Sequence, residues 1–136
     1  MVPPYKPKDV LILGYAGGTV AGLIKLLYGE LPITAVDIEP CEDRYNVNFI
    51  QADARDYIKT CSHFDCVVVD LSCNDELGMC DFITSKEFAT DVLKIGDFVV
   101  VNTSGEMDME EWGEKIGVNQ PTNSLNKIYY YGKIPS

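Results

Sequence analysis

The sequence is poor in basic residues and has a single histidine. Its 11 lysines and arginines are outnumbered by 21 aspartates and glutamates, so the formal net charge at pH 7 is -10. Nucleic-acid binding depends on a positive surface that releases counterions from phosphates, and this balance therefore argues against a DNA or RNA partner. We expect a small neutral or cationic molecule as substrate, although an acidic surface also serves solubility by itself.

Long hydrophobic runs and low-complexity tracts are absent as well. Apolar stretches such as 10–13 and 66–69 are far shorter than the roughly 20 residues that a membrane helix needs. The first eight residues contain three prolines and two lysines but no apolar segment of signal-peptide length. We therefore expect a cytoplasmic protein without membrane contact, in which residues 1–136 form one domain.

The cysteines show neither an even number nor a C-x-x-C pair, which argues against a disulfide framework and a zinc site. They are Cys41, Cys61, Cys66, Cys73 and Cys80. A metal site built from Cys61, His63 and Cys66 is conceivable, but thiols that pack as small apolar side chains are far commoner. We predict no metal ion.

Strand and helix patterns alternate along the chain. β-prone apolar runs and a tyrosine-rich segment predict strands over 10–13, 33–36, 47–50, 66–69, 98–101 and 127–131. Helical spacing of apolar residues, with capping and terminating residues, predicts helices over 19–28, 54–60, 85–93 and 109–116.

This alternation predicts an α/β fold of the three-layer, Rossmann-like kind. A mostly parallel sheet of about six strands should carry helices on both faces, with ligands beyond the carboxyl ends of the strands. Only residues 38–46 separate the second and third strands, whereas a helical crossover normally takes a dozen residues or more. We therefore expect the helix between these strands to be a single turn or absent.

A glycine-rich turn follows the first strand, from Gly14 to Thr19. Glycines at such a turn let the chain bend sharply and let a nucleoside or a phosphate approach the backbone. Ala16 and Thr19 stand where the dinucleotide fingerprint G-x-G-x-x-G has its second and third glycines, which argues against a nicotinamide cofactor. A tight bend without a ligand is the alternative interpretation.

Three aspartates follow the next three strands. Asp37 lies where a carboxylate can accept hydrogen bonds from ribose hydroxyls, or it could simply be a solvated or capping acid. Asp53 could accept from an adenine amino group or cap the helix that begins after it. Asp70 could accept a proton from an amine, or belong to a solvated acidic loop. Tyr5 and Tyr15 could stack on a base or pack in the core.

Together these segments resemble the spermidine synthase branch of the class I S-adenosylmethionine-dependent methyltransferase superfamily. The resemblance covers about residues 9–102, with matching order and spacing. It is carried by Val10-Leu-Ile-Leu-Gly-Tyr-Ala-Gly-Gly-Thr19, Val36-Asp-Ile-Glu39, Gln51-Ala-Asp-Ala54, Phe64-Asp-Cys-Val-Val-Val-Asp70 and Phe82-Ile-Thr-Ser-Lys-Glu-Phe88. A methyltransferase fold in a minimal form is the architecture that this resemblance implies.

The resemblance also implies a ligand and a reaction. The ligand is S-adenosylmethionine or a relative such as its decarboxylated form or methylthioadenosine, and the reaction is methyl or aminopropyl transfer to a small molecule. Asp70 would be the catalytic residue, orienting or deprotonating the attacking nitrogen. The implied ligand-binding residues are Gly14, Tyr15, Ala16, Gly17 and Gly18 for the methionine-derived part, Asp37 for the ribose, Asp53 and Ala54 for the base, and Asp70 beside the acceptor. Ile38, the residue after Asp37, is also expected to bind the ligand.

Several positions depart from the family pattern. Cys73 stands where the synthases have a second aspartate, and Ala16 replaces a glycine in a turn that lacks the family's usual acid. We also expect most of the N-terminal domain that roofs the amine site to be missing. These departures affect catalysis more than nucleoside binding, so a non-catalytic binding or scaffold protein is the alternative to a transferase. The segment 128–131 could in addition mediate a homodimer.

Overall fold

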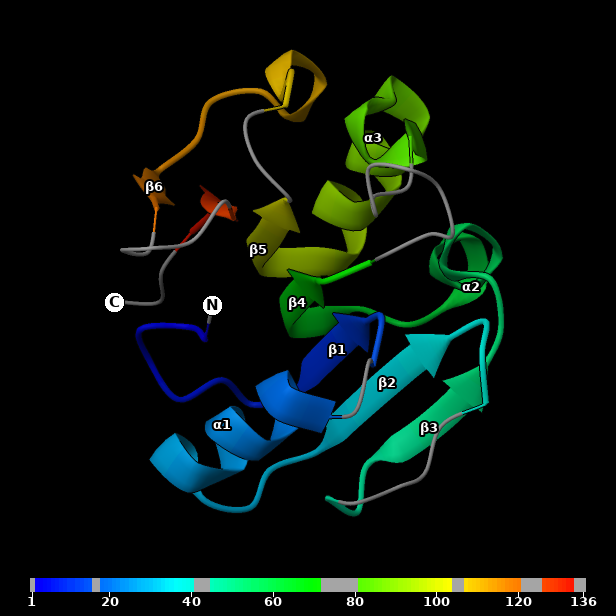
Figure 1. Ribbon diagram of the computed structural model, residues 1–136, viewed down its shortest axis with the longest axis vertical. Coiled ribbons are helices and arrows are strands. Elements are labelled where there is room, and N and C mark those ends of the chain that lie inside the picture. Colours follow the sequence, from blue (N-terminus) through cyan, green and yellow to red (C-terminus); the bar gives the residue numbers. More distant parts are fainter. Residues whose placement is uncertain are drawn as a thin grey trace.

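The computed structural model (Figure 1) describes residues 2–15, 18–40, 45–71, 81–103, 107–120 and 126–133. Its strands are β1 (Val10–Leu13), β2 (Ile33–Asp37), β3 (Asn48–Gln51), β4 (Phe64–Val69), β5 (Gly96–Thr103), β6 (Gly117–Asn119) and β7 (Lys127–Gly132). Its helices are α1 (Thr19–Tyr28), α2 (Ala54–Thr60) and α3 (Lys86–Ile95), with short 3-10 turns at η2 (Asp81–Thr84) and η3 (Glu110–Trp112).

The seven strands form one sheet in the order β3-β2-β1-β4-β5-β7-β6. The pairs from β3 through β5 are parallel, and β7 runs antiparallel to both β5 and β6. The chain winds outward from β1 to β3 on one side and continues at β4 on the other, so β1 and β4 flank the point where strand order reverses. Ligands of open α/β sheets bind beyond the strand ends at such a point.

Helices cover both faces of the sheet, as Figure 1 shows for α1 on one side and for α2 and α3 on the other. Successive residues of a strand point to opposite faces. Leu11 and Leu13 of β1 accordingly pack in the cluster that includes α2 and α3, whereas Val10 and Ile12 pack in the cluster that includes α1. Burial on both faces explains why the central strands are continuous apolar runs.

Local sequence signals set the helix ends. Ser85 caps α3, its Oγ accepting a hydrogen bond from the backbone N–H of Phe88 at 3.2 Å. Gly29 ends α1 with a φ of 78°, and its N–H donates to the carbonyl oxygen of Lys25. The sequence therefore predicts the end of α1 and the start of α3 to within one residue.

The sheet and its two helical layers confirm the predicted α/β, mostly parallel fold, with two differences. The strand β6 was not predicted, because it is only three residues long and two of them, Val118 and Asn119, are exposed. The helix expected over 109–116 is wrong beyond the three residues of η3, which ends at Gly113 with a φ of 80°. Between β2 and β3, the described residues 38–40 and 45–47 contain no helix, as predicted.

The two cysteines in the described part of the chain, Cys61 and Cys66, are free thiols. Cys66 is fully buried in β4, and this burial raises its pKa to about 12. Nε2 of His63 lies 3.0 Å from Oδ1 of Asp97, at the start of β5. Across the described segments, no three metal-ligating side chains converge, and no helix is both long and apolar enough to cross a membrane.

Candidate functional site

The end of β1 lies directly against the end of β4. Gly14 has a φ of 96°, and a Cβ atom at this position would lie 2.1 Å from the carbonyl oxygen of Asp70. The N–H of Gly14 donates to the carbonyl oxygen of Val36, and the N–H of Asp70 donates to that of Leu13. Only glycine satisfies both the positive φ and the close approach of Asp70. Gly14 therefore brings the turn after β1 against the backbone of Asp70, the residue that follows β4.

Asp37 ties the same turn to the end of β2. Its Oδ2 accepts a hydrogen bond from the backbone N–H of Tyr15 at 3.0 Å, and its Oδ1 accepts from the N–H of Glu39 at the same distance. The carbonyl oxygen of Asp37 also accepts from the N–H of Ala52, just beyond β3. Each carboxylate oxygen can accept more than one hydrogen bond, so these contacts leave Asp37 able to accept from a ligand.

The predicted stacking tyrosines pack against core rings. Tyr15 is buried, and its ring packs against Phe49 with a centroid distance of 5.9 Å. Tyr5 makes an edge-to-face contact with Phe98 at 5.6 Å. Both rings therefore pack against other core side chains, which was the alternative to stacking on a base. Tyr15 therefore contributes its backbone N–H to the turn, while its side chain fills the core.

The remaining residues of the glycine-rich turn are described in part. Gly18 has a φ of 85° and donates its N–H to the carbonyl oxygen of Tyr15, so it closes the turn before α1. Ala16 and Gly17, for which we predicted ligand contacts, lie outside the described residues. The same holds for Cys73 and the acidic loop around it.

Asp53 caps α2 and also holds an ion pair. Its Oδ1 accepts from the backbone N–H of Arg55 at 2.9 Å, which confirms the capping alternative. The Arg55 side chain adds two contacts, Nε to Oδ1 at 3.2 Å and Nη2 to Oδ2 at 2.8 Å. These hydrogen bonds from Arg55 hold the pKa of Asp53 below its ordinary value.

Ile38 and Ala54, both expected to bind the ligand, differ in exposure. Ile38 follows β2 with 64% of its surface exposed, so an apolar side chain lies open next to Asp37. The side chain of Ala54 is buried among the core residues below α2. Little of Ala54 is therefore exposed to a ligand at this position.

Asp70 has a partner that the sequence patterns did not single out. The Nδ2 group of Asn102 in β5 donates to Oδ1 of Asp70 at 3.0 Å. The carboxylate is half-buried, and its Oδ2 is not part of this contact. Asp70 was identified because it directly follows a predicted strand. Asn102 directly follows the predicted strand 98–101, so the same reasoning would have identified it.

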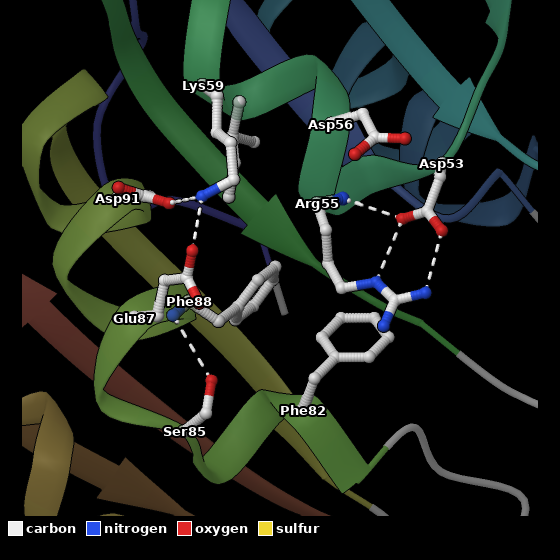
Figure 2. Close-up of a pocket in the computed structure, with 10 residues that line it drawn as sticks. Asp53, Arg55, Asp56, Lys59, Phe82, Ser85, Glu87, Phe88 and Asp91 are labelled. Carbon is white, nitrogen blue, oxygen red and sulfur yellow. Dashed lines mark hydrogen bonds and ion pairs between the residues drawn. The ribbon is translucent and has the colours of Figure 1, made fainter.

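A pocket of about 470 Å³ opens between α2, η2 and α3 (Figure 2). Among the predicted site residues Asp53 lines it, while Gly14, Asp37 and Asp70 lie outside its lining. Its walls also include Arg55 and Phe82, for which the sequence predicted no ligand contact. The guanidinium carbon of Arg55 lies 4.5 Å from the centroid of the Phe82 ring.

A second cationic side chain, that of Lys59, lies at the other end of the pocket. Nζ of Lys59 lies 2.6 Å from Oε1 of Glu87 and 3.0 Å from Oδ2 of Asp91, so it links α2 to α3. Glu87 and Asp91 are four residues apart on α3 and therefore share one face of that helix. Figure 2 shows the Lys59 pairs at one end of the pocket and the Arg55–Asp53 pair at the other.

No family model matches the chain, and no curated protein sequence matches it either. Solved structures do. Human methyltransferase-like protein 13, crystallised with SAH, superposes with a TM-score of 0.75 at 18% identity over 95% of this chain and 73% of its own.

Two further matches are spermidine synthases. A probable spermidine synthase from Corynebacterium glutamicum has a TM-score of 0.72 at 17% identity, covering 91% of this chain and 55% of its own. A spermidine synthase in complex with the transition-state analogue AdoDATO has a TM-score of 0.69 at 12% identity, covering 92% of this chain and 54% of its own. The chain thus spans just over half the length of these synthases. Identities this low show the architecture, and the chain has the class I methyltransferase fold.

Proposed function

We propose that this protein binds S-adenosylmethionine or a related adenosyl ligand, such as decarboxylated S-adenosylmethionine or methylthioadenosine, beyond the carboxyl ends of β1 to β4. One observation carries the proposal. The turn after β1 is held by a hydrogen bond to the Asp37 carboxylate and by close packing of Gly14 on the backbone of Asp70, which brings a glycine turn and two aspartate residues together where the strand order reverses. Two solved structures of the same fold hold SAH and AdoDATO, which supports an adenosyl ligand here.

The proposed roles follow the strand ends. The turn from Gly14 to Gly18 would hold the methionine-derived part, and Asp37 would accept from the ribose hydroxyls. Exposed Ile38 offers an apolar contact to the base. Asp53 would accept from the adenine amino group. Ala54 would contribute its backbone N–H, which lies in the first turn of α2 and has no acceptor within the helix.

We propose transfer of a methyl or aminopropyl group to a small acceptor as the reaction. The acceptor nitrogen attacks the carbon bound to the sulfonium, the carbon–sulfur bond breaks, and its electron pair stays on sulfur as a thioether. Asp70 would accept the proton that leaves the nitrogen, with Oδ1 oriented by Asn102. Holding donor and acceptor in line would supply most of the rate enhancement.

A second candidate is a non-catalytic binding or scaffold protein with the same ligand. It is favoured by Cys73, which stands where the synthases that the sequence resembles have a second aspartate. Incubation with isotope-labelled S-adenosylmethionine and its decarboxylated form, together with a panel of amines, separates the two candidates. Transfer that is lost in Asp70→Asn supports the enzyme, whereas binding without transfer to any acceptor supports the binding protein.

Isothermal titration with S-adenosylmethionine, S-adenosylhomocysteine and methylthioadenosine tests the binding itself. We expect saturable binding that Asp37→Asn weakens by about ten-fold or more, because an amide has one acceptor oxygen where the carboxylate has two. Asp97→Asn is the matched control, since it removes the same charge at the amino end of β5, on the opposite edge of the sheet. Absence of heat with all three ligands, at concentrations where the protein stays folded, contradicts the proposal.

A further inference from the structure

Arg55 makes two kinds of contact at once in the pocket of Figure 2. Its side-chain N–H groups donate to both carboxylate oxygens of Asp53, at 3.2 and 2.8 Å. Its guanidinium carbon also lies over the Phe82 ring, 4.5 Å from the ring centroid. A planar group with N–H donors at its edge thus contacts an acceptor and an aromatic platform together.

Other aromatic side chains hold the Phe82 ring in position. It packs edge-to-face on Phe88 of α3 with a centroid distance of 5.0 Å, and Phe88 packs in turn on Trp112 at 6.0 Å. The indole Nε1–H of Trp112 donates to the carbonyl oxygen of Ile83, the residue after Phe82, at 2.8 Å. Phe82 is therefore supported at the pocket by a row of packed rings and is no lone surface side chain.

The chemistry of Arg55 in this position matches that of an aminopurine. Adenine is also planar, carries N–H donors at its edge and stacks on aromatic faces. An acceptor that binds two guanidinium N–H groups can equally accept from an exocyclic amino group. Asp53 is also the residue to which the adenine amino group is assigned under the proposed function.

We propose that Phe82 is the stacking platform for the adenine of the ligand, and that Arg55 competes with the base for Phe82 and Asp53. This inference rests on the proposed function, which it deepens by naming the residues that select the base. Binding of an adenosyl ligand then requires the guanidinium to swing out and the base to take its two contacts. Arg55 is a specificity-determining residue, because only a base that donates to Asp53 restores the hydrogen bonding that the departing guanidinium gives up.

The displacement is energetically accessible because the pair is open to solvent. The Arg55 side chain is 54% exposed and that of Asp53 is 24% exposed. Exposed ion pairs and exposed cation–π contacts are both weak, since water solvates the separated charges well. The guanidinium therefore acts as a modest competitor that raises the dissociation constant without blocking the pocket.

Titration of four variants with methylthioadenosine and with its 6-oxo counterpart, methylthioinosine, tests the inference. We expect Arg55→Ala to bind methylthioadenosine about three- to ten-fold more tightly than the wild type. Phe82→Ala should bind it about ten-fold more weakly than the wild type, and Phe82→Leu should be intermediate because leucine fills the space but offers no ring. Lys59→Ala is the matched control, because its amine also pairs with two carboxylates but lies at the end of the pocket away from Asp53 (Figure 2).

The ligand pair separates competition from a general loosening of the pocket. The 6-oxo group of methylthioinosine cannot donate to Asp53, so the gain in Arg55→Ala should be clearly smaller for this ligand, which gains access to the Phe82 ring alone. Equal or weaker binding of methylthioadenosine by Arg55→Ala, or an equal gain with Lys59→Ala, overturns the inference and leaves the proposed function intact. Failure of the wild type and all variants to bind either ligand contradicts the proposed function and the inference with it. Thermal melts of each variant confirm that folded protein is being compared.

Discussion

The side-chain amide of Asn102 donates a hydrogen bond to Oδ1 of Asp70 at 3.0 Å and thereby links the end of β5 to the end of β4. The other polar atom of the same amide, Oδ1 of Asn102, is buried and has no hydrogen-bond partner among the described residues. One side chain therefore combines a favourable contact to a carboxylate with an unfavourable buried acceptor. Substitutions that remove both groups, or that turn the contact into a repulsion, separate the two effects.

Asn102→Leu should change the free energy of unfolding by less than about 1 kcal/mol, because the lost hydrogen bond and the removed buried acceptor are of similar size and opposite sign. Asn102→Asp should be clearly less stable at pH 7, because it sets a second carboxylate beside Asp70. The deficit should shrink as the pH is lowered from 7 into the acid range, because protonation of one carboxylate removes the repulsion. Urea denaturation across this range measures both variants, and equal stability at pH 7 would contradict the expected repulsion.

Gly14→Ala should be strongly destabilising. A left-handed backbone costs a non-glycine residue about 1–2 kcal/mol, and the new Cβ would in addition lie 2.1 Å from the carbonyl oxygen of Asp70. Gly29→Ala is the control, since Gly29 has a φ of 78° but a Cβ there would meet no atom within 4 Å. We expect about 1–3 kcal/mol for the control, whose ψ of -160° lies in a region that is essentially restricted to glycine, and a clearly larger loss for Gly14→Ala, measured by chemical denaturation. Similar losses in the two variants would mean that the contact with Asp70 relaxes easily.

Cys66 should resist alkylation as long as the protein is folded. Its thiol is fully buried in β4, and burial raises its pKa to about 12, so thiolate and reagent access are both scarce. Cys61 is only half-buried and should react first at pH 8. Peptide mass spectrometry after timed labelling resolves the two sites, and in denaturant they should react at similar rates. Labelling of Cys66 at the rate of Cys61 in the native protein would show that β4 opens without global unfolding.

The strands that the sequence predicts well are those buried on both faces. Continuous apolar runs leave few alternatives for β1 and β4, because each side chain needs a covered face. The short strand β6 has no such constraint, since it is stabilised through backbone pairing with β7 rather than by its own side chains. Pairing with β7 also extends β5 to Thr103, beyond the predicted end at Val101. The existence of β6 and the length of β5 therefore both depend on pairing with β7, which the pattern within each strand does not encode.

The candidate site also contains residues that the sequence predicts and residues that only the packing of distant segments reveals. Gly14, Asp37 and Asp70 could be predicted because the ends of parallel strands meet at one edge of the sheet, and the structure brings these three together. Arg55 and Phe82 could not, because their contact depends on how η2 and α2 pack. No pattern within either segment encodes that packing. Tyr15 shows the reverse case, in which a residue of a predicted ligand turn is committed to the core.

The pH dependence of stability should reveal the Asp53–Arg55 pair. The hydrogen bonds from Arg55 hold the pKa of Asp53 below its ordinary value, so the folded protein binds this proton less readily than the unfolded chain does. The stabilisation is therefore complete above the unfolded pKa and is lost as the pH falls through the folded value. Asp53→Asn keeps an N-cap for α2 but removes the charge, so the wild type should be slightly more stable at pH 7 and lose that advantage below about pH 4. Denaturation curves of both proteins measure the difference, which high salt should also reduce because the pair is exposed. A difference that does not vary with pH would assign the role of Asp53 to capping alone.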